Sequence, residues 1–239
     1  MKPLFTIHAG EFLVASYIEH HFKDYLVWLP SRDSGVDLLL TDKHCKKAAS
    51  IQVKFSRDFL STHMADALRP GLKACGWFTL KPQKLSHSTA NLWVFVLYPF
   101  NQKELDFVII PPSIAHDIVT SLHGRQKTVQ SYIWVTKKKQ CWEARGLNRR
   151  DQLLIANNSY KNPTRDLTPY LNNWSPVTAE LGPNQAMERT ATRRAFTFPV
   201  ASAPPLQATP RSRWPSLILF SLDAAVMIYL MHRTQARFR

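Results

Sequence analysis

Four polar residues that could bind a metal ion or take part in catalysis occur early in this chain, each within an otherwise apolar segment: Glu11, Asp37, Gln52 and Lys54. Carboxylate and amide oxygens are ligands of hard cations, and an ammonium group beside an oxygen pair is suited to activating a water molecule. These residue types therefore indicate hydrolysis assisted by a divalent cation, provided that the fold brings the side chains together.

The first apolar segment, residues 36–40, carries one acidic side chain. Successive side chains of a strand point to opposite faces. Asp37 therefore faces one side of the expected strand. The opposite side is apolar and consists of Val36, Leu38 and Leu40. This alternation predicts a strand with one face toward the core and a carboxylate on the other.

The second apolar segment, residues 51–55, has the same alternation. Gln52 and Lys54 face one side of the expected strand. The opposite side is apolar and consists of Ile51, Val53 and Phe55. Both segments are therefore expected to present polar side chains away from the core.

The linker between these segments, residues 42–49, is polar and short, which favours an antiparallel hairpin. We expect the hairpin to be symmetric about His44 and Cys45. Asp37 then lies opposite Gln52, with the two Cβ atoms about 5 Å apart. The lysine of the second strand follows on the same face, about 7 Å further along.

The segment before the first strand has helical spacing over residues 6–22. Val14, Ile18 and Phe22 recur at i, i+4 and i+8, which is typical of one buried helix face. Glu11 lies three residues before the first of them, near the expected helix N-terminus. Its carboxylate is therefore expected to point inward, toward the sheet.

The order of a helix Glu, a strand Asp and a Gln-x-Lys motif on the next strand resembles the PD-(D/E)xK nuclease superfamily, the restriction-endonuclease-like and Holliday-junction-resolvase-like group. Within it, the chain is similar to small stand-alone members whose third motif is Gln-Val-Lys. The resemblance covers roughly residues 5–150. It implies an α/β (α+β) fold with a mixed central sheet flanked by helices, and a metal-dependent endonuclease that acts on nucleic acid, with DNA as the expected substrate.

The resemblance also implies a role for each motif residue. In this superfamily the strand Asp, the third-motif acid and the carbonyl between that acid and the lysine bind a divalent ion, usually Mg²⁺. The matching groups here are Asp37, Gln52 and the carbonyl of Val53. Lys54 matches the lysine that orients or deprotonates the attacking water, and Glu11 matches the helix acid that supports the metal. Mn²⁺ is the expected substitute for Mg²⁺.

The chain departs from the superfamily pattern at two positions. Val36, preceded by Ser34-Gly35, stands where the proline of the superfamily name is expected. Gln52 replaces a carboxylate and so removes a negative charge from the cation site. A unit charge pair at ~4 Å is worth ~4 kcal/mol at an effective dielectric of about 20, and desolvation cancels part of it. The resemblance therefore implies weaker metal binding than an acid would give.

Each of these residues also has a plainer interpretation. Glu11 fits a first-turn acid favoured by the helix dipole, and Asp37 fits a turn or strand-entry residue. Gln52 and Lys54 fit the solvated face of an edge strand. Their joint order and shared face favour the nuclease-like site. A catalytically inactive nuclease-like module that binds DNA or a protein is the second functional class.

Composition is consistent with an anionic partner. The formal net charge is +14, and Lys and Arg side chains that neutralise phosphates release counterions on binding. Two lysine runs, residues 46–47 and 137–139, are candidate flanks for a duplex. The expected partner is double-stranded or branched DNA, and a homodimer would suit the cutting of two strands. The histidines lack paired ligand spacing, and three cysteines are too few and scattered for a zinc ribbon or a disulfide framework.

The rest of the first 161 residues alternates between strands and helices. Residues 66–75 are expected to hold a helix interrupted by Pro70-Gly71. A helix is expected from Pro111-Pro112-Ser113 to His123, because proline is favoured at a helix start. Segments rich in Val, Ile and aromatic residues predict strands over 77–80, 91–100, 106–110, 132–136 and 140–144, the last two as a hairpin.

Composition changes near residue 162. Lys161 is the last lysine, and nine of the sixteen prolines follow it. We therefore expect a nuclease-like domain over residues 1–161, a Pro/Arg-rich linker or disordered tail over 162–213, and an apolar segment over 214–239 that is compatible with a helix.

A membrane anchor is the alternative for the last segment. The apolar run Leu217–Met231 is shorter than the ~20 residues that a spanning helix needs, and Asp223 would cost about 3 kcal/mol near the bilayer centre. We therefore expect no membrane span. The N-terminus lacks a charged stretch followed by an apolar one, so a cytoplasmic protein is expected.

Overall fold

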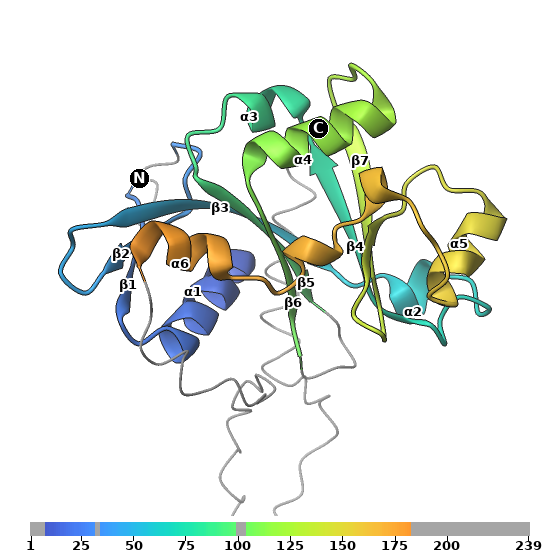
Figure 1. The fold of residues 1–239 in the computed structure, drawn as a ribbon, viewed down its shortest axis with the longest axis horizontal. Coiled ribbons are helices and arrows are strands. Elements are labelled where there is room, and N and C mark those ends of the chain that lie inside the picture. Colours follow the sequence, from blue (N-terminus) through green and yellow to red (C-terminus); the bar gives the residue numbers. More distant parts are fainter. Residues whose placement is uncertain (1–7, 32–33, 99–103, 183–239) are drawn as a thin grey trace, which may run out of the picture. The chain divides into compact units, whose positions relative to one another are not determined.

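The protein forms two β-sheets flanked by helices, as Figure 1 shows for the computed structural model, which describes residues 8–31, 34–98 and 104–182. Eight strands occur in this part of the chain, with helices between groups of one to three strands. The expected α+β class, with a mixed central sheet between helices, is therefore confirmed.

The larger sheet has five strands in the order β1-β2-β3-β5-β6. Its members are β1 (Tyr25–Trp28), β2 (Leu38–Asp42), β3 (Ala48–Arg57), β5 (Leu92–Tyr98) and β6 (Asp106–Ile110). β1, β2 and β3 form an antiparallel meander, β5 runs parallel to β3, and β6 runs antiparallel to β5. Parallel strands need a crossover connection, and the segment between β3 and β5 in the sequence contains α2 (Leu60–His63), β4 (Leu72–Leu80) and α3 (Pro82–Ser86).

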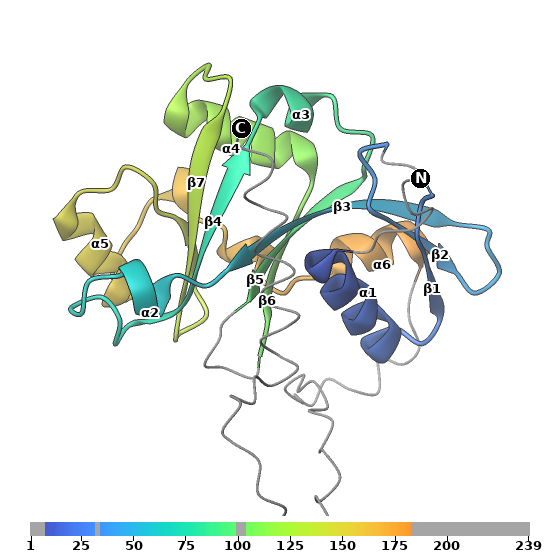
Figure 2. The same ribbon diagram turned by 180° about the vertical axis from the view of Figure 1, so that it is seen from behind.

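Helices cover one face of this larger sheet. α1 (Ala9–His21) buries the predicted stripe, since Val14 and Ile18 are fully buried and Phe22 follows at the helix end. α6 (Ser175–Leu181) packs on the same cluster through Val177 and Leu181. Figures 1 and 2 show both helices on the same part of the sheet, next to β1, β2 and β3. The apolar faces predicted for β2 and β3 therefore pack against α1 and α6.

The second sheet lies against the opposite face of β5 and β6. It has three antiparallel strands in the order β4-β7-β8: β4 (Leu72–Leu80), β7 (Val129–Thr136) and β8 (Cys141–Glu143). A shared core joins the two sheets, in which the Phe78 and Phe95 rings meet edge to face at 5.0 Å. α3 (Pro82–Ser86) and α4 (Pro112–His123) adjoin this core. The helix predicted to begin at the proline pair and the hairpin of β7 and β8 are both confirmed.

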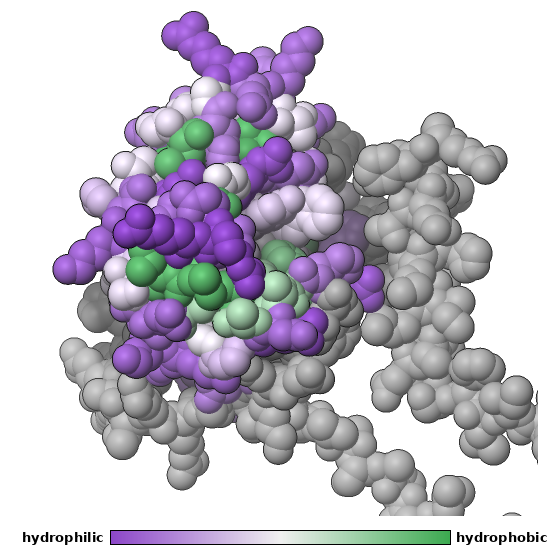
Figure 3. Space-filling model, turned by 90° about the vertical axis from the view of Figure 1, so that its right-hand side faces the viewer, coloured by the Kyte–Doolittle hydropathy of each residue, from purple (hydrophilic) through white to green (hydrophobic). Residues whose placement is uncertain are grey.

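A third apolar cluster lies at the far end of the second sheet, where α2 (Leu60–His63) and α5 (Arg149–Ala156) meet β4. Gly71 precedes β4 at a close backbone approach, because a Cβ there would lie 1.9 Å from the carbonyl oxygen of Ala156. Figure 3 shows the surface on this side, where green apolar residues form a limited area among mostly hydrophilic ones.

The helix expected over residues 66–75 is wrong. This segment forms successive turns, in which Leu68 N–H donates to Ala65 at 2.9 Å and Gly71 N–H donates to Leu68 at 3.2 Å. β4 then begins at Leu72 and pairs with β7. Pairing with a distant strand and the Pro-Gly pair together override the local helical pattern.

The apolar face predicted for residues 36–40 is correct for Leu38 and Leu40, which are fully buried, and wrong for Val36. Val36 is half-buried and packs on the core between the two sheets, because β2 begins only at Leu38. Alternation does not hold for a residue that precedes the strand. Phe55 of β3 is also more open than expected, at 38% exposure.

The domain boundary expected at residue 161 is wrong, since the chain stays packed through Gly182. Trp174 of this extension is buried and stacks on Tyr17 of α1, with ring centroids 5.1 Å apart. Asn172 donates to the buried carboxylate of Asp106 at 2.9 Å. A few anchoring side chains are sufficient to order a segment whose composition resembles a linker.

The remaining predictions for the C-terminal part lie outside the described residues. They concern the expected tail from 183 onward and the apolar run Leu217–Met231. In residues 8–182, as far as they are described, no helix is both long and apolar enough to cross a bilayer.

Candidate functional site

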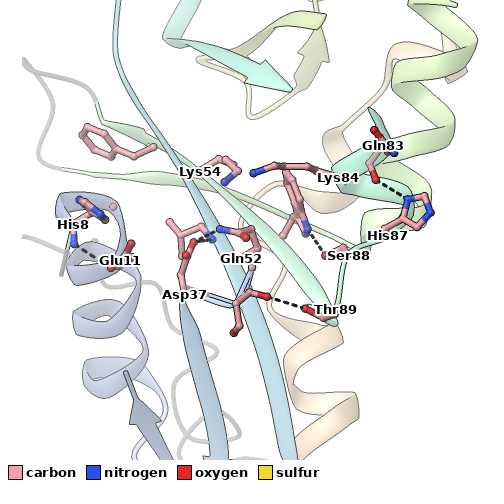
Figure 4. A pocket seen from close by; sticks show the side chains of 16 residues that line it. His8, Glu11, Asp37, Gln52, Lys54, Gln83, Lys84, His87, Ser88 and Thr89 are labelled. Carbon is pink, nitrogen blue, oxygen red and sulfur yellow. Dashed lines mark hydrogen bonds between the residues drawn. The ribbon is translucent and has the colours of Figure 1, made fainter. Parts of the chain in front are cut away.

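One open cavity of about 640 Å³ is lined by the five residues that the sequence indicated as catalytic or metal-binding candidates. They come from three places in the fold: the first turn of α1, the residues just before β2, and the middle of β3. The sequence-predicted members of its lining are Glu11, Asp37, Gln52, Val53 and Lys54. Figure 4 shows Glu11, Asp37, Gln52 and Lys54 around a common opening, with Gln83 and Lys84 of α3 (Pro82–Ser86) on the far side.

The register of β2 and β3 brings the first two of these polar side chains together. Leu38 pairs with Ile51, so Asp37 lies opposite Gln52, as predicted. The backbone N–H of Asp37 donates to the carbonyl of Ile51 at 2.8 Å, which extends the ladder by one residue. The expected hairpin is therefore confirmed in its register.

Asp42 explains why the hairpin has this register. Its carboxylate accepts hydrogen bonds from the backbone N–H groups of Lys46 and Lys47 at 2.7 and 2.6 Å, and from that of His44 at 3.2 Å. These bonds, led by the one from Lys47, hold the pKa of Asp42 below its ordinary value. Cys45 adopts a φ of 54°, which closes the turn at the predicted centre.

Asp37 is the most constrained acid in the cavity. Its Oδ2 accepts hydrogen bonds from Nε2 of Gln52 and, at 2.6 Å, from the backbone N–H of Val53. Because β2 begins only at Leu38, the Asp37 carboxylate accepts the Val53 N–H bond that a backbone carbonyl would accept in a longer strand. Oδ1 accepts no hydrogen bond from the described residues and belongs to a side chain that lines the cavity.

Two further oxygens lie close to this carboxylate. The carbonyl of Val53 points to the same edge of β3 as its N–H, because both groups of one residue lie on one side of an extended strand. The amide oxygen of Gln52 faces Gly35, where a Cβ would lie 4.0 Å from it. Gly35 has a φ of +82°, so this turn requires glycine and leaves open space beside the amide.

Lys54 is positioned by an aromatic ring. Its Nζ lies 5.1 Å from the ring centroid of Trp93, which occupies the matching face of β5. Trp93 is 3% exposed, and its indole N–H donates to the hydroxyl of Ser88 at 2.9 Å. A cation over an aromatic face is stabilised by about 0.5–2 kcal/mol. The ring therefore limits the range of positions that the amine explores.

Glu11 has two roles in this geometry. Its carboxylate accepts a hydrogen bond from the backbone N–H of His8 at 3.0 Å, which caps α1 as the plainer interpretation expects. The same side chain lines the cavity. Gly10 brings this helix end close to β3, because a Cβ there would lie 2.7 Å from Cβ of Phe55.

The sequence did not indicate the far wall of the cavity. It is formed by α3 and the residues that follow it: Gln83, Lys84, His87, Ser88 and Thr89. The short helix is closed by the His87 ring, which lies 2.9 Å from the carbonyl of Gln83. No local pattern connects these residues with the first strands. The lysine runs expected as duplex flanks, residues 46–47 and 137–139, do not line the cavity.

The oxygens of the cavity suit a hard cation that keeps several water ligands and takes only a few from the protein. Among the residues that the structure describes, no group of three or more His, Cys, Asp and Glu side chains is placed to hold a metal ion. The available donors are the carboxylate of Asp37, the carbonyl of Val53 and the amide oxygen of Gln52, with Glu11 in the same cavity. An all-oxygen set fits Mg²⁺ or Mn²⁺, although Gln52 must turn its amide so that oxygen replaces nitrogen beside Asp37.

Comparison with protein-family models gave no match, and no curated protein or solved structure matches the chain significantly. The arrangement of side chains in the cavity is therefore the basis for the functional inference.

Proposed function

We propose that this protein is a metal-dependent endonuclease that hydrolyses phosphodiester bonds of nucleic acid, with DNA as the expected substrate. The observation that carries the proposal is the convergence of Asp37, Gln52 and Lys54 in one cavity with Glu11. The residue order that resembles the PD-(D/E)xK superfamily thus corresponds to side chains that share one space.

The proposed cation ligands are Asp37, the amide oxygen of Gln52 and the carbonyl of Val53. A bound Mg²⁺ or Mn²⁺ would neutralise charge on the scissile phosphate and lower the pKa of a coordinated water. Asp37 is held in place for this role by the backbone N–H of Val53, so its carboxylate needs little reorganisation.

Lys54 is the residue proposed to act on the attacking water. Its amine lines the cavity beside the Trp93 ring and donates hydrogen bonds without being able to accept them when charged. It can therefore hold the attacking water by donating to one of its lone pairs, which leaves the other lone pair for phosphorus, and it can offset negative charge that develops on the phosphate oxygens. Glu11 supports the site from the helix side by adding a carboxylate to the same cavity.

A catalytically inactive nucleic-acid-binding module is the second candidate, and one contact favours it. The Gln52 amide nitrogen satisfies the Asp37 carboxylate directly, so this acid has a partner without any cation. A glutamine at this position also leaves the centre of the site with a single carboxylate.

Cleavage assays separate the two candidates. Plasmid and branched DNA are incubated with the full chain and Mg²⁺ or Mn²⁺, with RNA as a parallel substrate. We expect nicked or cut DNA with the native protein, and a loss of at least about 100-fold with Asp37→Asn or Lys54→Gln. Lys137→Gln is the matched control for charge, because this lysine does not line the cavity.

Absence of cleavage by the native protein would support the inactive module. Cleavage that survives both cavity substitutions would refute the site. Circular dichroism of each variant checks that the fold is retained.

A further inference from the structure

A second cavity, of about 970 Å³, adjoins the candidate site on the far side of α3. It lies between α3 and the segment that joins α4 to β7, and Figures 1 and 2 both show α3 next to α4. Its lining includes four basic side chains and no acidic one: Lys81, Lys84, Arg125 and Lys127. We refer to this cavity as the α3 groove.

The α3 groove and the candidate site share two lining residues. Gln83 and Lys84 line both cavities, so the short helix α3 forms the wall between them. Figure 4 shows the amine of Lys84 pointing into the first cavity from the side opposite Glu11. A chain of phosphates that leaves Lys54 therefore meets further cations on the far side of α3.

Two basic residues elsewhere in the domain differ from the cations of the α3 groove, which share their lack of ion pairs with residues 137–139. Lys73 and Arg165 are neutralised by the buried carboxylates of Asp106 and Glu143, at 2.9 and 2.6 Å. The four basic side chains of the groove form no ion pair with any residue of the described ranges. Unneutralised like charges around a hollow repel one another, and a polyanion relieves that repulsion.

The uncharged members of the groove fit the same ligand. Thr120, Gln126 and Thr128 supply hydroxyl and amide groups, which contact phosphate oxygens in many protein–nucleic acid interfaces. No Phe, Tyr or Trp side chain lines the groove, and its single ring, that of His116, is hydrogen-bonded to Asp117 at 3.2 Å, so base stacking has little platform there. The groove is suited to a sugar-phosphate backbone and not to unstacked bases.

We propose that the α3 groove binds the phosphate backbone of a DNA duplex on one side of the scissile bond, from the candidate site across α3 to Lys127. This inference rests on the proposed function for the position of the scissile bond. It goes beyond that function by naming the surface that binds the DNA backbone. It also states that the lysines of residues 137–139 do not contribute to this binding.

Two triple variants of equal charge test the groove. The groove variant is Lys81→Gln, Arg125→Gln and Lys127→Gln, all exposed side chains whose loss is not expected to affect folding. The control variant replaces the three lysines of residues 137–139 with Gln. The two sets lie at opposite ends of β7, because Val129 pairs with Leu80 and Thr136 pairs with Leu72. A strand of this length separates them by about 25 Å.

Binding of a fluorescent DNA duplex to the full chain is measured by anisotropy between 50 and 200 mM salt, in EDTA and on an Asp37→Asn background so that no cleavage occurs. Each phosphate contact contributes about 0.9 to the slope of log affinity against log salt concentration. We expect the groove variant to lose two to three units of slope, or about 0.9 for each contact, and at least tenfold in affinity. The control variant should stay within about twofold of the parent affinity.

Equal losses in the two variants would overturn the proposal, because net charge alone would then explain binding. A groove variant that binds like the parent protein would also overturn it. A single-stranded oligonucleotide bound more tightly than the duplex, and weakened by the groove variant, would refute the duplex assignment. Since these measurements need neither metal nor turnover, failure of the cleavage assay alone leaves the groove assignment intact.

Discussion

Replacing Gln52 with Glu adds a carboxylate beside Asp37, at the position where the resemblance to the PD-(D/E)xK superfamily implies an acid, and it changes one functional group without changing side-chain length. The Nε2 of Gln52 is hydrogen-bonded to Oδ2 of Asp37, so the new carboxylate would lie in contact with the existing one. Two carboxylates in contact repel each other unless a proton or a cation lies between them. The substitution therefore favours cation binding in two ways, by adding a ligand and by destabilising the cation-free state.

The size of the effect follows from Coulomb's law. A unit charge pair 4 Å apart contributes about 4 kcal/mol at an effective dielectric of about 20. If desolvation cancels about two thirds of this energy, about 1.4 kcal/mol remains, which corresponds to a tenfold lower Kd. We therefore expect Gln52→Glu to bind Mg²⁺ and Mn²⁺ at least about tenfold more tightly than the native protein.

Isothermal titration calorimetry with each cation measures this change. Gln83→Glu is the matched control, because Gln83 lines the same cavity from α3 and adds the same charge away from Asp37. We expect its effect on Kd to be less than about threefold. A second readout is the melting temperature, which should fall in EDTA for Gln52→Glu and recover when Mn²⁺ is added.

An unchanged Kd in Gln52→Glu would refute the cation site. The same is true if Gln83→Glu tightens binding equally, because general attraction of cations into an acidic cavity would then be sufficient.

Three further substitutions test other parts of the structure. Gly71→Ala should lower the free energy of unfolding by about 2 kcal/mol in chemical denaturation, because its Cβ would overlap the carbonyl oxygen of Ala156; an unchanged midpoint would contradict that close approach. Burial lowers the pKa of His21, so the folded state favours the neutral ring and stability is lost as pH falls below 6.5. His21→Phe should therefore reduce the drop in melting temperature between about pH 7.5 and pH 5.5, and an equal drop in both proteins would count against it. Glu11→Gln should keep the helix cap, since an amide oxygen can accept the hydrogen bond from His8, and should weaken Mn²⁺ binding several-fold while the melting temperature changes little. A loss of stability without any change in metal affinity would limit Glu11 to the capping role.

Local patterns were sufficient wherever the structure depends on near neighbours. The apolar run Asp106–Ile110 forms β6 within the predicted bounds, and α4 begins at the proline pair and ends at His123 as expected. The opposition of Asp37 and Gln52 was also predictable. Strand alternation and a short polar turn allow few registers, and Asp42 stabilises the one observed through bonds within the turn itself.

The surroundings of the site required the tertiary structure. Trp93 approaches Lys54 only because β5 returns parallel to β3 after a crossover that contains β4 and α3. The same crossover brings Lys84 to the cavity. Packing likewise ordered residues 162–182, whose composition predicted a linker, through anchors such as Trp174. Contacts between segments far apart in the chain depend on how the two sheets and their helices pack. The hydrophobic pattern of a short stretch of sequence cannot predict that packing.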